Sequence, residues 1–167
     1  MSLTGSDLLR AEAMALLRGV GAHMPFGAAV ADLPDAAINA RPPNVPYTPF
    51  HLLEHLRRTQ RDILDYIRDR AYVAPRWPED YWPAPDEIAD RARLEATIEA
   101  FRADADALEG IVTDPATDLL AVLSGTPGHT ILREVRLVGD HNAYHIGEFA
   151  ILRQVMGSWP ASRGADT

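Results

Sequence analysis

The chain has 167 residues, no cysteine, 24 acidic residues and 16 basic residues that are all arginine, which gives a net charge of -8. This length fits one domain with a sizeable core, and the lack of cysteine excludes both a disulfide framework and a thiolate metal site. Because the arginines are scattered and the net charge is negative, nucleic acid is not expected as a partner. Because there is no cysteine, any metal ion must be bound by histidine or carboxylate.

A first amphipathic helix is predicted over residues 5–20, where leucine and alanine recur at helical spacing. Ser6 is its expected N-cap, and Gly19 and Gly21 are its expected stops. Charged residues interrupt this segment, which argues against a secretory leader, and no apolar run approaches the roughly 20 residues that a membrane span requires. A cytoplasmic protein without a membrane anchor is therefore expected.

Residues 22–46 are rich in alanine and proline and lack a sustained period, which predicts a long connection with room for a short helix. A second helix is predicted from Thr48 to about Asp69, because Thr48 can act as N-cap and Pro49 takes the first helical position, where its missing N–H costs nothing. Residues 71–85 contain four prolines, so this segment cannot be helical throughout and is expected to pack across one end of a bundle.

A third helix is predicted from an Asp86 cap to about Glu109, with Ile88 on its inner face and Gly110 as its stop. Residues 114–128 are expected to be irregular, with a strong break at 125–128. A last helix is predicted from about residue 129 to residue 156, ended by Gly157. Four long amphipathic helices and one long crossover connection predict an all-α four-helix bundle that forms a single domain over residues 1–167.

Four of the six histidines form two pairs with i, i+4 spacing, which places each pair on one helix face: His51 with His55, and His141 with His145. His141 and His145 both fall within the apolar arc of the last helix. Two buried imidazoles need partners for all their ring nitrogens, and a shared metal ion meets that need. His55 lies at the edge of the apolar stripe of the second helix, whereas His51 lies about 40° further toward solvent. His55 is therefore the expected third ligand.

Three imidazoles and an open position are typical of a catalytic Zn²⁺ site and also suit Ni²⁺ or Fe²⁺. Glu148 lies one turn beyond His145 on the same side, as a candidate fourth ligand, acid/base or acceptor that holds an imidazole tautomer. An ordinary ion pair with an arginine is the alternative for Glu148, and ordinary core or surface histidines are the alternative for the whole site. His23 and His129 lie near breaks in the helices and are expected to be solvated or capping.

Residues 51–55 match the pattern H-x-x-E-H, in which two histidines bind zinc and the glutamate is the general base of inverzincin peptidases. Glu54 points away from the apolar stripe of the predicted helix, and inverzincin peptidases are far longer chains. The match is therefore interpreted as coincidental.

Four stretches of the chain resemble the DinB-like superfamily of small metal-binding bundles, which also includes bacillithiol and mycothiol S-transferases. The resemblance rests on residues 47–57, 60–64, 77–83 and, above all, 140–148. The shared features are an H-x-x-x-H motif in the C-terminal helix and a histidine followed by leucine in the second helix. The resemblance implies His55, His141 and His145 as metal ligands in an up-down-down-up bundle that often forms a homodimer. Members of the family commonly carry glutamine where this chain has Glu148, and this departure would allow a fourth protein ligand in place of an open position on the metal.

The resemblance also implies a metal-dependent enzyme acting on a small molecule. Relatives act as thiol S-transferases, in which the metal lowers the pKa of a low-molecular-weight thiol co-substrate, or are described as hydrolases, in which it activates water. Under this hypothesis Glu148 is the candidate acid/base, and Tyr144 and Trp82 are candidates for the pocket wall, although Trp82 is also expected to close a bundle end. The alternative hypothesis is a non-catalytic stress-response bundle in which the ion is structural.

Overall fold

A computed structural model describes residues 4–123 and 126–160. Within these ranges the chain forms six helices, and its only strand-like feature is an isolated bridge between Val122 and Thr130. None of these helices is both long enough and apolar enough to cross a membrane. The four long helices are α1 (Gly5–Leu17), α4 (Pro49–Arg68), α5 (Arg91–Thr113) and α6 (Ile131–Val155), and the short α2 (Phe26–Val30) and α3 (Asp35–Ile38) lie between α1 and α4.

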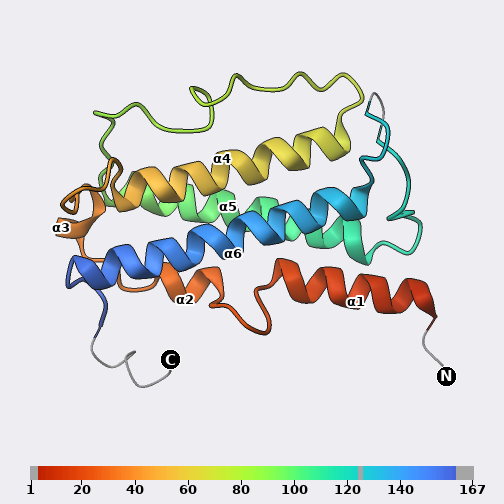
Figure 1. Ribbon diagram of the computed structural model, residues 1–167, viewed down its shortest axis with the longest axis horizontal. Helices are drawn as coiled ribbons and strands as arrows, with labels where there is room; N and C mark the ends of the chain where they lie inside the picture. Colours follow the sequence, from red (N-terminus) through yellow and green to blue (C-terminus); the bar gives the residue numbers. More distant parts are fainter. Residues whose placement is uncertain (1–3, 124–125, 161–167) are drawn as a thin grey trace.

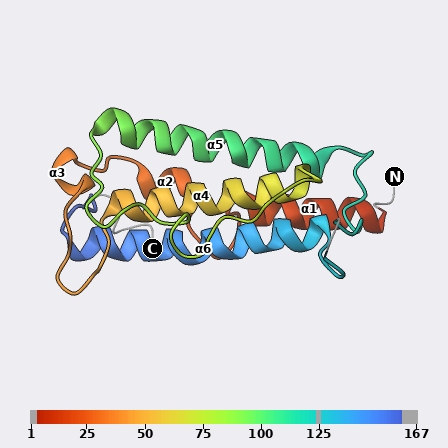
Figure 2. The same ribbon diagram turned by 90° about the horizontal axis from the view of Figure 1, so that it is seen from above.

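The long helices form a bundle in which α4 and α5 run in one direction and α1 and α6 in the other, as Figures 1 and 2 show. The predicted all-α, up-down-down-up bundle is thereby confirmed. Because α4 and α5 are parallel, the chain between them must return along the whole bundle, and residues 69–90 do so outside α4 (Figure 1). The prediction that residues 71–85 pack across a bundle end was wrong. We call residues 69–90 the crossover segment.

Local capping signals explain where most of the long helices begin. The Thr48 hydroxyl accepts a hydrogen bond from the third amide of α4, 3.2 Å away, and Thr130 caps α6 in the same way. The caps of α4 and α6 agree with the predicted starts to within two residues. Helix α1 begins instead at a capping box formed by Thr4 and Asp7, so the predicted Ser6 cap was wrong. The predicted break at residue 125 lies outside the described ranges.

Helix α5 begins four residues later than predicted, at an Asp90 cap, and runs through Gly110 to Thr113. Ile88 was expected on its inner face but precedes the helix and is 77% exposed. The backbone just before α5 makes hydrogen bonds outside the helix. The Ala89 amide donates to the Asn39 side chain at 2.9 Å, and the Ala89 carbonyl accepts from it at 2.8 Å. These contacts hold residues 86–90 in the crossover segment and delay the helix.

The core lies between α4, α5 and α6, and a polar link crosses it. The Gln60 amide donates to the Phe101 carbonyl at 2.7 Å and accepts from the Asn142 amide at 2.9 Å, which ties α4 to both neighbouring helices. Asn142 directly follows His141, so this link also holds the central part of α6 against α4. The surrounding buried apolar side chains include Phe50, Leu52, Leu53, Leu56, Leu94, Leu108, Val135 and Phe149.

Candidate metal centre

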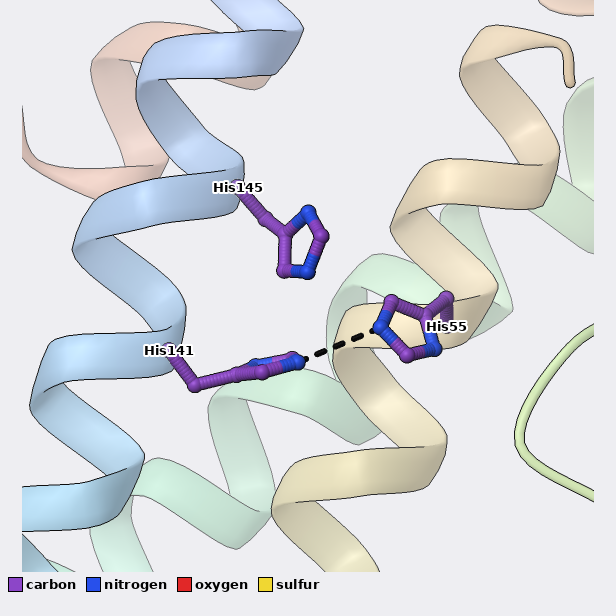
Figure 3. Close-up of side chains that lie close together, drawn as sticks. All are labelled: His55, His141 and His145. Carbon is purple, nitrogen blue, oxygen red and sulfur yellow. Dashed lines mark hydrogen bonds between the residues drawn. The ribbon is translucent and has the colours of Figure 1, made fainter. Parts of the chain in front are cut away.

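His55 of α4 meets His141 and His145 of α6 in the space between these two helices (Figure 3). The Nε2 atoms of His55 and His141 are 3.2 Å apart, and one ring nitrogen from each of the three histidines lies within 4.8 Å of the other two. Ligand nitrogens about 2.0–2.1 Å from a tetrahedral metal ion are roughly 3.3 Å from each other. The three-histidine cluster therefore fits a divalent metal ion.

A backbone carbonyl of the crossover segment sets the orientation of His55. The buried His55 ring has its Nδ1 atom 3.0 Å from the Tyr81 oxygen. A carbonyl can only accept a hydrogen bond, so the ring proton is on Nδ1 and the lone pair is on Nε2, which faces His141. The Trp82 ring stacks on one face of the His55 ring, with 3.9 Å between the ring centroids and 6° between the ring planes.

His145 is oriented by a carboxylate rather than by a carbonyl. Its Nδ1 atom lies 2.6 Å from Oε2 of Glu148, and the other carboxylate oxygen of Glu148 accepts a hydrogen bond from the Tyr47 hydroxyl. Figure 3 shows one His145 nitrogen turned toward the other two histidines and the second turned away. Glu148 thus contacts the nitrogen that points away from the centre, and it is not part of the group that could hold a metal ion.

Burial keeps these imidazoles in the neutral form that metal ligation requires. Desolvation lowers the pKa of His55, and it lowers that of His141 to about 4 with a further contribution from the neighbouring His55 ring. Desolvation and the adjacent His141 and His55 rings also lower the pKa of His145. Burial raises the pKa of the Glu148 carboxyl, although this group accepts hydrogen bonds from two donors. All three histidines are therefore neutral near pH 7.

His51 does not join the cluster, as predicted, but it does not face solvent either. Its side chain is 2% exposed, because the crossover segment covers it, and its Nε2 atom is 2.8 Å from the Glu87 carbonyl. The expected position toward solvent was wrong, since helical periodicity cannot show that a non-helical segment lies over the outer face of α4. His51 and His55, one turn apart, both bind backbone carbonyls of this segment.

Glu54, the glutamate of the H-x-x-E-H pattern, is turned toward α5 and is 1% exposed. It accepts hydrogen bonds from Arg57, Arg58 and Thr97. Burial alone would raise its pKa, but the two arginines lower the pKa of Glu54 to about 2. A carboxylate that is so firmly ionised and paired is a poor general base, which agrees with the interpretation of the pattern as coincidental.

The remaining candidates lie at or away from the cluster. Tyr144 is 70% exposed, and its ring centroid lies 4.8 Å from that of His145, so it borders the cluster from the solvent side. His129 is half-buried and 3.2 Å from Glu134, and His23 is half-buried with its Nδ1 atom enclosed, so neither is simply solvated. Tyr81 and Tyr47 were not predicted as partners of the histidines, and Trp82 was expected at the pocket wall or at a bundle end but not stacked on His55. Helical spacing could not have indicated these contacts, because Tyr81 acts through its backbone carbonyl and all three residues lie far from α6 in sequence.

A family model described as the DinB superfamily matches residues 21–149, a range that contains the three histidines and Glu148. No curated protein and no solved structure gives a significant match to the chain.

Proposed function

The chain belongs to the DinB superfamily, and on that premise we propose that it is a metal-dependent enzyme acting on a small molecule. In this proposal His55, His141 and His145 hold one divalent transition-metal ion, of which Zn²⁺, Ni²⁺ and Fe²⁺ all suit an imidazole set. The observation that carries the proposal is the convergence of three neutral imidazoles within the bundle. A bound ion supplies Lewis acidity, which lowers the pKa of a thiol or of water so that it becomes nucleophilic at neutral pH.

Glu148 is assigned the role of an acceptor that orients His145, in preference to that of a fourth ligand or an acid/base. Both of its carboxylate oxygens are engaged, one by Tyr47 and the other by His145. A carboxylate that accepts the Nδ1 proton of an imidazole fixes the tautomer and turns the Nε2 lone pair toward the metal. This assignment leaves the fourth position around three histidines free for a substrate.

Of the two reaction types known for such bundles, transfer of a thiol to an electrophile is favoured over hydrolysis. Hydrolysis gains from a protein base that takes a proton from water. Within the described residues no carboxylate joins the three histidines, Glu148 is committed to two partners and Glu54 is paired with arginines. A low-molecular-weight thiol needs only ionisation, and it must come from outside because the chain has no cysteine.

We expect the metal-loaded protein to accelerate attack of a small thiol on 1-chloro-2,4-dinitrobenzene. In this reaction a sulfur–carbon bond forms, the carbon–chlorine bond breaks, chloride leaves and the thiol proton goes to buffer. The rate of aryl thioether formation, measured by absorbance for a panel of thiols, should fall to the uncatalysed rate after chelation and return when the metal is added back. His145→Ala should not exceed the uncatalysed rate under any metal condition.

The same experiment tests the alternative of a structural ion. A catalytic ion in an accessible site can be removed with little loss of folding, whereas a structural ion contributes its binding free energy to the folded state. If chelation lowered the melting temperature by many degrees while no thiol in the panel reacted faster than in buffer, the ion would support the fold alone. The homodimer implied by the resemblance stays a prediction.

Replacing His51 with alanine is expected to leave about one equivalent of bound metal, although the variant unfolds at lower denaturant concentration. The substitution removes one buried hydrogen bond to the Glu87 carbonyl, which is worth about 1 kcal/mol, and touches none of the three ligands. Elemental analysis and urea denaturation measure the two effects. Loss of the metal in this variant would identify His51 as the ligand from α4 in place of His55.

A further inference from the structure

The crossover segment is attached to α4 at the level of the metal centre and again two turns further along. Tyr81 makes both attachments: its carbonyl accepts from Nδ1 of His55 at 3.0 Å, and its hydroxyl donates to Oδ2 of Asp62 at 2.8 Å. His55 and Asp62 are seven residues apart, so they lie on the same face of α4. One residue of the crossover segment thus connects a carboxylate remote from the cluster with a histidine inside it.

Asp62 is shared between two tyrosines of the crossover segment. Its Oδ1 atom accepts from the Tyr72 hydroxyl at 2.5 Å, while its Oδ2 atom accepts from Tyr81. Burial and the hydrogen bond to Asp62 raise the pKa of Tyr81 to about 12, so its hydroxyl remains a donor throughout the neutral range. Of the two tyrosines, only Tyr81 also contacts the histidine cluster, through the hydrogen bond between its backbone carbonyl and Nδ1 of His55.

Arg58 supplies a second anchor beside the first. It lies between His55 and Asp62 on α4, and its Nη1 atom donates to the Trp82 carbonyl at 2.8 Å while its Nε atom donates to Glu54 at 3.0 Å. The carbonyls of residues 81 and 82 are therefore both held from α4. Loss of the Tyr81 hydroxyl contact should loosen the peptide without releasing it.

We propose that Asp62 is a positioning residue for the three-histidine cluster, acting through Tyr81. By holding the Tyr81 hydroxyl, Asp62 keeps the Tyr81 carbonyl on Nδ1 of His55 and so keeps the Nε2 lone pair of His55 directed at His141 and His145. Figure 3 shows the two His55 nitrogens in these roles, one facing His141 and the other turned away from it. The consequence for metal affinity rests on the proposed function, whereas the tautomer of His55 is a property of the metal-free protein.

Tyr81→Phe and Tyr72→Phe form a matched pair for testing this role in the full-length chain. Each removes one tyrosine hydroxyl from the same carboxylate, but only the first loosens the carbonyl that binds His55. In metal-free protein, ¹⁵N–¹H NMR of the imidazoles should show His55 protonated at Nδ1 in the wild type and in Tyr72→Phe, and a mixture of tautomers in Tyr81→Phe. Asp62→Asn should give the same mixture as Tyr81→Phe.

Zn²⁺ affinity, measured by competition with a chromophoric chelator, is the second readout. Loss of a group that orients a metal-binding histidine typically weakens metal binding about 10–100-fold, and we expect about tenfold for Tyr81→Phe because Arg58 still holds the neighbouring carbonyl. Tyr72→Phe should bind Zn²⁺ as the wild type does, even if both variants lose similar stability in urea.

Equal losses of Zn²⁺ affinity in the two tyrosine variants would overturn the proposal, since the effect would then be one of general stability. A single Nδ1-protonated tautomer of His55 in Tyr81→Phe would overturn it as well. If the tautomer changes only in Tyr81→Phe and Asp62→Asn while no form of the protein binds metal, the positioning role holds and the proposed function fails.

Discussion

Replacing His141 or His145 with alanine is expected to reduce the bound metal from about one equivalent to background. Either change leaves two imidazoles, and within the described residues no other histidine or carboxylate is placed to complete the site. His55→Ala should have the same effect, because His55 supplies the only ligand from α4. The measurement is elemental analysis of protein purified without an affinity tag, so that no added histidines carry metal.

His129→Ala is the matched control for this series. His129 precedes α6 and lies beside Glu134 and Tyr66, away from the three-histidine cluster. Its replacement should therefore leave the metal content unchanged. A full equivalent of metal retained in any one of the three cluster variants would show that the remaining residues suffice, and the three-histidine site would have to be abandoned. Wild-type protein that is metal-free and cannot be loaded would leave a histidine-containing bundle without metal chemistry.

Replacing Glu54 with alanine is expected to lower the free energy of unfolding by about 3 kcal/mol, the largest stability effect anticipated for a side chain near the centre. The carboxylate is almost fully buried and bridges α4 to α5 through Arg57 and Arg58 on one side and Thr97 on the other. Its removal leaves two partly buried guanidinium groups without their common partner. Urea denaturation followed by circular dichroism gives the free energy of unfolding.

Glu109→Ala provides the comparison for the Glu54 variant. Glu109 also pairs with an arginine, Arg18, at 2.7 Å, but this pair lies at the surface and should contribute far less to stability because solvent screens it. Equal destabilisation of the two variants would mean that burial of Glu54 does not determine its contribution. A separate variant, Glu54→Gln, tests the H-x-x-E-H pattern. If Glu54 were a general base, this variant would be inactive while its metal content and stability were unchanged.

Features that depend on residues within one or two helical turns could be predicted from the sequence. The start of α4 at Thr48 and Pro49 follows from capping, and the adjacency of His141 and His145 follows from their i, i+4 spacing. The amphipathic stripe of α4 was enough to favour His55 over His51 as the residue facing α6. The same reasoning gave a wrong start for α5. Asp86 was the predicted cap, but the backbone of Ala89 forms hydrogen bonds with the distant Asn39 side chain, and the helix begins after them.

The sequence by itself determined where the four long helices lie, to within five residues at each end, and it favoured His55, His141 and His145 as a group, because helical periodicity and capping are local properties of the chain. Only the tertiary structure decided how those histidines are held. The Tyr81 carbonyl on His55 and the Tyr47 hydroxyl on Glu148 join residues 26 and 101 positions apart. Every residue has a carbonyl, and the crossover segment has no period, so its path depends on the parallel directions of α4 and α5. The partners that orient the cluster are therefore set by topology.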